Sequence, residues 1–181
     1  MFFTLTVDNE IELQLIEERH AEGLFALVDD CRDYLAERLP WVPGITSVDD
    51  QRQFTRRVRK EFGEGRTVPL AMVYRGELCG VVSGHLGGNR RAEIGYWIHE
   101  DYQGNGIVTR SCRQLIDYLF ENYKLHRLVV RADPDNPRSW RIPDGLGFTH
   151  EGTLRDAGYL QGEFIDLRVY SLLRPEWQER S

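Results

Sequence analysis

The sequence predicts a single α/β domain over residues 1–181, with a mixed, mostly antiparallel sheet and helices on both faces. A strand, a long helix and a second strand follow one another over residues 92–131, which typically gives one parallel βαβ unit. Two apolar runs, residues 68–74 and 78–84, flank Arg75-Gly76-Glu77 in the pattern of an antiparallel hairpin. The 181 residues are 41% hydrophobic, which is enough to bury one core.

Before this hairpin, the chain is expected to form one strand and two helices. Residues 10–16, EIELQLI, alternate polar and apolar side chains, as a half-buried strand does. From about residue 21 to residue 39 apolar side chains recur at helical spacing, and Pro40 and Pro43 then interrupt the pattern. Ser47 is expected to cap a charged helix that runs to about Phe62, because serine is favoured at the N-cap and aspartates follow it in the first turn.

After the hairpin, the expected elements alternate between strands and helices. Residues 92–98, AEIGYWI, are expected to form a strand, and residues 127–131, RLVVR, are expected to form a short buried strand. A short helix is expected from Ser139, as its N-cap, to about Leu146, and residues 164–173 alternate as a last strand. The helix between residues 106 and about 123 presents one apolar face, formed by Val108, Cys112, Leu115, Ile116 and Leu119.

Composition and charge exclude several classes of protein. The chain has 23 Lys and Arg against 29 Asp and Glu, a formal net charge of −6, which argues against nucleic acid as a partner. No apolar run approaches the roughly 18 residues of a membrane span, and the first 15 residues do not resemble a signal peptide. The three cysteines and the histidines show no metal-ligand spacing, so no metal is expected. We therefore expect a cytoplasmic protein with buried, reduced cysteines.

Two glycines one residue apart open the long helix, in the stretch DYQGNG, residues 101–106. A helix N-terminus attracts anions, and glycines let a phosphate oxygen approach the free amides closely. The dinucleotide pattern G-x-G-x-x-G/A fails at Thr109, and the Walker pattern does not occur in the sequence. A third pattern, Q/R-x-x-G-x-G/A between a strand and a helix, matches Gly104 and Gly106 but has Asp101 at its first position. A tight turn without a ligand remains the alternative.

The sequence around these glycines resembles that of the RimJ/RimL branch of the GNAT acetyltransferases. Similar segments occur there in the same order: IGYW and YQGNG, then the N-x-x-S spacing of Asn136 and Ser139, then LGFTHEG. The stretch RDYLAERLPWV resembles an element of the N-terminal half, so the resemblance covers nearly the whole chain. It implies the GNAT fold, in which the strand before the glycine loop splays from the strand after the helix.

The resemblance also implies that acetyl-coenzyme A is the co-substrate. Its pantetheine arm would pair with the strand AEIGYWI, and a backbone N–H near Trp97 or Ile98 would face the thioester oxygen. Asn136 resembles the residue that hydrogen-bonds the coenzyme, and Ser139 resembles the general acid for the departing sulfur; a plain helix cap is the alternative for Ser139. The amides expected to hold the pyrophosphate belong to Gln103, Gly104, Asn105, Gly106, Ile107 and Val108.

The general base is not defined by the sequence. Glu93 matches a strand carboxylate that some histone-type relatives use as a base, and an exposed strand charge is the alternative. Where the ribosomal branch has a glutamate proposed as base, this chain has Gly158. Deprotonating an α-amine at pH 7 costs only about 1 kcal/mol, whereas a lysine amine costs about 4.6 kcal/mol. An enzyme without a strong base therefore suits an α-amine better.

The predicted function is transfer of an acetyl group to a protein N-terminal α-amine by direct attack in a ternary complex. A small amine, such as a polyamine, an amino acid or an aminoglycoside, is the alternative acceptor. A non-catalytic sensor that binds acyl-coenzyme A is the alternative of another class, and Gly158 leaves it open. Dimers are common in this branch, so a homodimer is one expected state.

Overall fold

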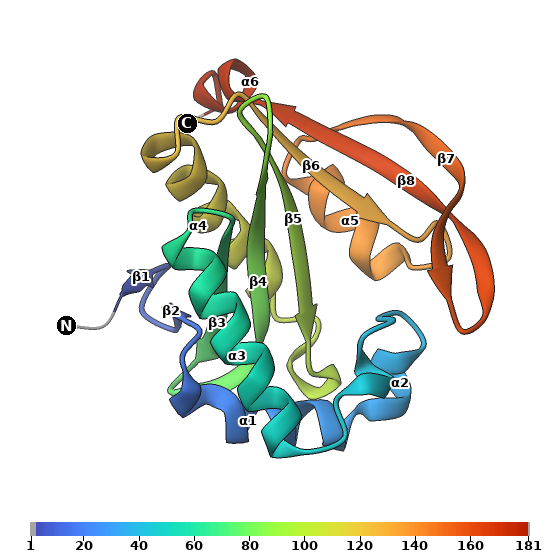
Figure 1. Cartoon of the computed structure of the whole chain (residues 1–181). Helices are drawn as coiled ribbons and strands as arrows, with labels where there is room; N and C mark the ends of the chain where they lie inside the picture. The colour runs from blue at the N-terminus through green and yellow to red at the C-terminus, as the bar shows by residue number, and fades with distance from the viewer. Residues whose placement is uncertain (1–2, 181) are drawn as a thin grey trace.

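The structure is a computed structural model that describes residues 3–180. Eight strands, six α-helices and three short 3-10 turns lie within these residues, and Figure 1 shows them in sequence colours. The strands are β1 (Thr4–Thr6), β2 (Ile11–Leu15), β3 (Thr67–Tyr74), β4 (Glu77–Gly87), β5 (Arg91–Ile98), β6 (Arg127–Ala132), β7 (Thr149–Leu160) and β8 (Glu163–Leu173). The helices are α1 (Ala21–Asp30), α2 (Arg32–Ala36), α3 (Val48–Gly63), α4 (Ile107–Asn122), α5 (Pro137–Gly145) and α6 (Arg174–Gln178), with 3-10 turns η1 (Glu18–His20), η2 (Val42–Gly44) and η3 (Glu100–Tyr102).

The strands form one sheet in the order β1-β2-β3-β4-β5-β6-β8-β7. Every neighbouring pair is antiparallel except β5 and β6. These two strands pair only from Arg91 to Glu93, opposite Arg127 to Val129, although β5 continues to Ile98. The pair therefore separates halfway along β5, which confirms the expected mixed sheet with one splayed parallel pair (Figure 1).

Helices cover both faces of the sheet. The helix α4 packs on one face, where its apolar residues recur every three to four positions and are buried against β2, β4, β5 and β6. On the other face, α1 and α3 bury a smaller cluster around Leu24, Val58, Ala71 and Val81. No helix among residues 3–180 has the length and apolar character needed to cross a membrane.

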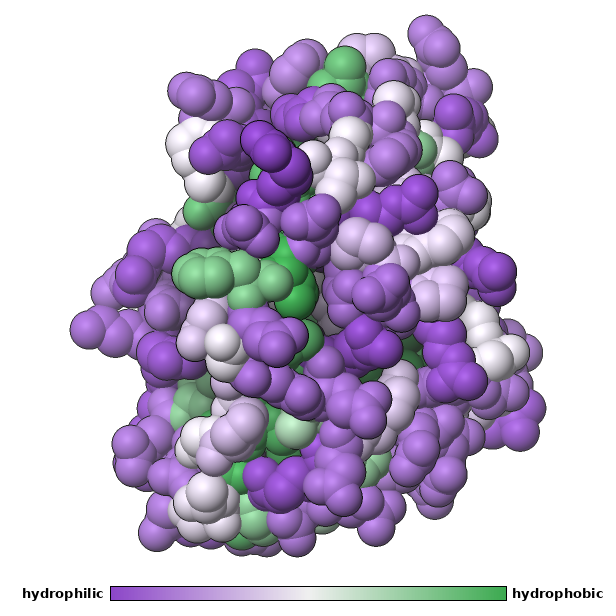
Figure 2. Space-filling view, turned by 90° about the vertical axis from the view of Figure 1, so that its right-hand side faces the viewer, coloured by the Kyte–Doolittle hydropathy of each residue, from purple (hydrophilic) through white to green (hydrophobic). Residues whose placement is uncertain are grey.

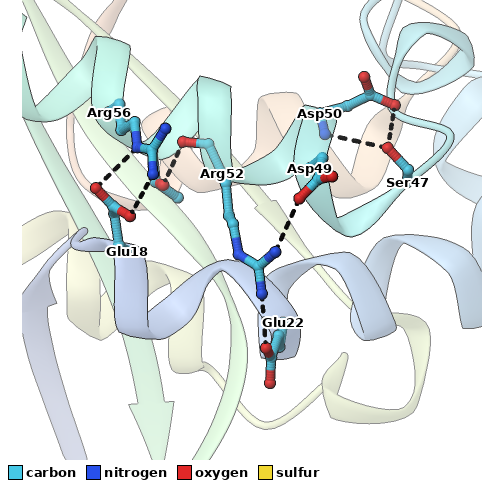
Figure 3. A network of polar contacts seen from close by, with 8 residues as sticks. Glu18, Glu22, Ser47, Asp49, Asp50, Arg52 and Arg56 are labelled. Carbon is cyan, nitrogen blue, oxygen red and sulfur yellow. Dashed lines mark hydrogen bonds and ion pairs between the residues drawn. The ribbon is translucent and has the colours of Figure 1, made fainter.

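The outer side of α3 is tied to the chain before it by two arginines, which Figure 3 shows together. Arg56 donates to both oxygens of Glu18 in η1, at 2.8 and 3.0 Å. Arg52 joins Asp49 in its own helix, at 2.8 Å, to Glu22 in α1, at 2.9 Å. Ser47 caps α3 by accepting the N–H of Asp50, as the sequence predicts. These contacts hold α3 against α1 on the face opposite α4.

Two local predictions are wrong. The helix expected over residues 21–39 is two helices, because Cys31 has non-helical torsions (φ −116°, ψ 35°). The neighbouring Asp30 reaches His99, 2.9 Å away, so a contact distant in sequence favours the break there. Ser139 is not the N-cap of its helix: α5 begins at Pro137, and Asn136 is the cap. Asparagine caps as well as serine, and proline is favoured in the first turn because it has no N–H to leave unpaired.

Candidate active site

A cleft of about 1640 Å³ opens where β5 and β6 separate. Its walls come from the ends of these strands, the segment between β5 and α4, the start of α5, and residues of α2 and α3. Figure 2 shows the side of the molecule on which α2 and the β7–β8 hairpin lie, where hydrophobic residues sit recessed among hydrophilic ones. Elements distant in the sequence therefore meet around one opening in the sheet.

The two glycines lie at the mouth of this cleft, before the first helical turn of α4. Gly104 (φ +79°) and Gly106 (φ +67°) both have left-handed backbones, and Gly106 is the N-cap. The first helical hydrogen bond runs from the N–H of Arg110 to the carbonyl of Gly106, so the preceding amides have no partner within the helix. A Cβ added at either glycine would meet no protein atom within 4 Å. The left-handed torsions explain why both positions are glycine. The open space in front of them can accommodate an anion.

Gln103 connects this loop to both rims of the cleft. Its amide nitrogen donates to the Tyr34 hydroxyl on α2, at 2.6 Å, and its amide oxygen accepts from Arg138 on α5, at 2.7 Å. The Arg138 guanidinium therefore lies near the positive end of α4, where both would attract a diphosphate. The pattern Q/R-x-x-G-x-G/A can also be aligned with Gln103 at its first position and the N-cap Gly106 at its first glycine. In this alignment Asp101 lies outside the pattern, and the mismatch is Val108 at the last position.

The free edge of β5 forms the floor of the cleft. The N–H of His99 donates to the carbonyl of Cys79 on β4, at 2.9 Å. Since backbone groups alternate sides along a strand, the N–H groups of Tyr96 and Ile98 face the opposite edge, and that of Trp97 faces β4. Beyond Glu93 no β6 partner takes this edge. The sequence suggested the N–H of Trp97 or Ile98 as the donor to the thioester oxygen. This alternation favours the N–H of Ile98.

Asn136 and Ser139 lie on the far wall, both in the cleft lining. The side-chain oxygen of Asn136 accepts the N–H of Ser139, at 3.3 Å, so the cap fixes the first turn of α5. The Tyr96 hydroxyl donates to the backbone carbonyl of Ser139, at 2.8 Å, which ties α5 to the edge of β5. Burial raises the pKa of Tyr96, so this hydroxyl remains a donor. The sequence did not indicate this tie, because the two residues belong to different elements.

Two predicted site residues lie outside the cleft lining. Asn105 turns its side chain back to the carbonyls of Tyr102 and Gln103, at 3.2 and 3.3 Å. Glu93 stands in the paired part of β5, where Arg131 of β6 holds both its oxygens, at 2.9 and 2.8 Å. The remaining predicted coenzyme contacts are in the lining, namely Trp97, Ile98, Gln103, Gly104, Gly106, Ile107, Val108, Asn136 and Ser139. The backbone N–H of Gln103, however, donates to the carbonyl of Glu100, at 3.1 Å, so it is not free for a phosphate.

An aromatic wall lies toward α2 and α3. The ring of Trp41 is nearly parallel to that of Phe54, at 15° with centroids 6.5 Å apart, and it also contacts Trp97, at 5.9 Å. Trp41 is 38% exposed.

Acidic side chains, among them Glu61 and Glu100, line the same cleft. Within residues 3–180 no group of three or more His, Cys, Asp or Glu side chains could hold a metal ion.

Comparisons with known proteins define the class. Residues 10–149 match the family described as "Acetyltransferase (GNAT) domain". The chain is 36% identical over 179 residues to the "Putative ribosomal N-acetyltransferase YdaF" of Bacillus subtilis (strain 168), covering 97% of this chain and 98% of that protein. The chain belongs to the GNAT family and is an N-acetyltransferase.

Solved structures of acetyltransferases share the fold. One is RimL, the ribosomal L7/L12 alpha-N-protein acetyltransferase, in complex with coenzyme A, with 27% identity, a TM-score of 0.92 and coverage of 96% of this chain and 99% of that chain. Another is the microcin C7 self immunity acetyltransferase MccE in complex with acetyl-CoA and AMP, with 28% identity, a TM-score of 0.89 and coverage of 92% and 94%. RimL-type relatives thus extend over nearly the whole chain.

Proposed function

We propose that this enzyme transfers an acetyl group from acetyl-coenzyme A to a protein N-terminal α-amine, by direct attack in a ternary complex. The observation that carries the proposal is the unpaired edge of β5, which ends at a glycine-rich helix N-terminus. Such an edge can accept an extended amide-bearing arm as an added strand, and the helix terminus can accept its diphosphate. The complexes of RimL with coenzyme A and of MccE with acetyl-CoA support this choice of donor.

We assign donor binding, thioester polarisation and thiolate protonation to groups of the cleft. The amides from Gly104 to Val108 would hold the diphosphate, and the N–H groups of Ile98 and Tyr96 would bind the arm and polarise the thioester oxygen. The neutral amine attacks the thioester carbon, so a C–N bond forms and the C–S bond breaks. The Ser139 hydroxyl would give its proton to the departing thiolate, and the proton that the nitrogen loses as the amide forms would restore the hydroxyl, directly or through water. The side-chain amide NH₂ of Asn136 is left to contact the coenzyme, since its oxygen accepts the N–H of Ser139.

A protein N-terminus is favoured by the relatives and by the low cost of deprotonating an α-amine. Both YdaF and RimL carry ribosomal substrates in their names. The cleft lining carries both acidic side chains and arginines, so its charge does not by itself select the acceptor. An α-amine costs only about 1 kcal/mol to deprotonate at pH 7, so it makes a modest demand on a base.

A thiol-release assay with acetyl-coenzyme A and a panel of amines tests the proposal. The panel contains peptides with free N-termini, the same peptides with blocked N-termini and a free lysine side chain, and polyamines. We expect release with the free N-termini and little with the blocked peptides. Faster release with lysine side chains than with N-termini would contradict the proposed acceptor.

A small amine that carries a planar ring is the second candidate acceptor. The near-parallel rings of Trp41 and Phe54 favour it, because flat aromatic faces bind planar groups by stacking. The MccE neighbour was solved with AMP as well as acetyl-CoA. An aminoacyl-nucleotide analogue added to the panel separates the candidates: release that falls on Trp41→Ala only for this compound would favour the second acceptor.

A further inference from the structure

Ser83 and His85 lie together on β4, on the α3 side of the cleft. Both are in the cleft lining, and the Ser83 oxygen is 3.0 Å from Nε2 of His85. Alternation along β4 places them on the same face as Val81, which packs in the cluster under α1 and α3. This face is opposite α4, so the pair stands on the side of the opening that the coenzyme loop does not occupy.

These side chains cover the backbone of Gly95 on the neighbouring strand. The Ser83 hydroxyl can donate to the carbonyl of Gly95, its register partner, at 3.4 Å, or to Nε2 of His85 at the shorter 3.0 Å. A Cβ added at Gly95 would lie 3.5 Å from the Ser83 oxygen and 3.8 Å from Nε2 of His85. Gly95 precedes Tyr96, whose N–H faces the free edge of β5. The pair therefore stands one residue from an amide proposed to bind the donor.

The carboxylate that the sequence suggested as a base is engaged elsewhere. Glu93 is the register partner of His85, and both its oxygens bind Arg131. The other charged groups on α3 that line the cleft are Asp50, Arg57 and Glu61. Among these groups, the His85 imidazole is the one that contacts Ser83 and has a ring nitrogen able to accept a proton.

We propose that Ser83 and His85 form the proton relay that accepts a proton from the acceptor ammonium. This inference rests on the proposed function. The ammonium gives its proton to the Ser83 oxygen while the Ser83 hydroxyl proton passes to Nε2 of His85. The products are a neutral amine, which can attack the thioester, and an imidazolium, which returns its proton to water.

The pH dependence of kcat/KM with a free-N-terminus peptide tests the relay. His85→Gln keeps a polar side chain but cannot carry the proton, so we expect kcat/KM at pH 7 to fall by about 100-fold. The loss should shrink as the pH rises above about 8, where the α-amine is already neutral. His126→Gln, at an exposed position outside the cleft lining, is the matched control and should follow the wild type.

The outcomes separate the relay from the proposed function. Wild type that releases no thiol with any amine would overturn the function itself. Wild type that turns over, with His85→Gln following the same pH profile, would overturn the relay alone. Ser83→Ala should lower kcat/KM at pH 7 by about 10-fold; a wild-type rate in that variant would also overturn transfer through Ser83. Coenzyme affinity should be unchanged in both variants, which shows that each is folded.

Discussion

At the scale of single residues, the site depends on side chains and torsions that have a specific physical reason. Gly104 and Gly106 need left-handed torsions, and both leave open space in front of unpaired amides. The sequence predicts the importance of these glycines, because two of them at a helix start are otherwise unfavourable. It does not predict the Arg131–Glu93 pair, since the two residues are 38 positions apart and meet only when β5 pairs with β6.

The substitution Gly106→Ala should weaken coenzyme binding beyond its effect on stability. A left-handed alanine costs about 1–2 kcal/mol, and its methyl group would enter the space before the amides. We expect the Kd for coenzyme A to rise about 10-fold or more, as measured by calorimetry. Gly65→Ala is the matched control, because Gly65 has φ +68° and is not in the cleft lining. Equal binding losses in the two variants would contradict a role for Gly106 in binding.

The substitution Ser139→Ala should separate chemistry from binding. The hydrogen bond that holds the first turn of α5 uses the backbone N–H of Ser139, so the helix keeps it in the variant. Loss of a general acid should lower kcat by about 100-fold, while coenzyme affinity changes by only about twofold. Steady-state kinetics and calorimetry measure the two quantities. An unchanged kcat would leave Ser139 as a structural residue of α5.

At the scale of elements, the pattern of apolar residues predicts the helices and strands that are buried and misses those that are mostly exposed. The helix α4 buries one regular face, whereas β3 and the middle of β4 are apolar runs buried on both faces, and the sequence locates these elements and β5. The strand β7 was not predicted, because most of its residues are exposed and its pairing with β8 shifts register at two places. The break between α1 and α2 was missed because residues 28–34 contain no Gly or Pro to mark it.

The link between β6, β7 and β8 predicts a pH-dependent contribution to stability. Arg127 on β6 donates to Glu151 on β7, at 2.8 Å, and the Ser171 hydroxyl of β8 donates to it at 2.7 Å. These bonds lower the pKa of Glu151 from its ordinary 4.5 to about 2. Because the folded-state pKa is the lower one, folding favours the ionised form. The stabilisation is complete above about pH 4.5 and is lost as the pH falls toward 2.

We therefore expect Glu151→Gln to destabilise the protein at pH 7 and to differ little from wild type near pH 2. The loss should be below about 1 kcal/mol, since the pair is partly exposed and screened by solvent. Urea unfolding at several pH values measures it, with Glu121→Gln at an exposed position of α4 as the control. A loss that persists at the lowest pH would mean that the ionised form of Glu151 is not what stabilises these strands.

At the scale of the whole molecule, the proposed function depends on the separation of β5 from β6. The chain pairs β5 with β6 over three residues and then separates them, and the cleft opens at that point. The sequence predicts the βαβ unit, and the family resemblance predicts the splay. The walls could not be predicted from local sequence, because α2, α3 and α5 are brought together only by tertiary packing. Trp41, Phe54 and Trp97 become a single wall in this way.

A crystal structure of the complex with acetyl-coenzyme A tests this account most directly. We expect diphosphate oxygens within about 2.7–3.2 Å of the amides between Gly104 and Val108, and the pantetheine arm beside Tyr96 and Ile98. A coenzyme bound elsewhere, with the edge of β5 beyond Glu93 left uncovered, would contradict it.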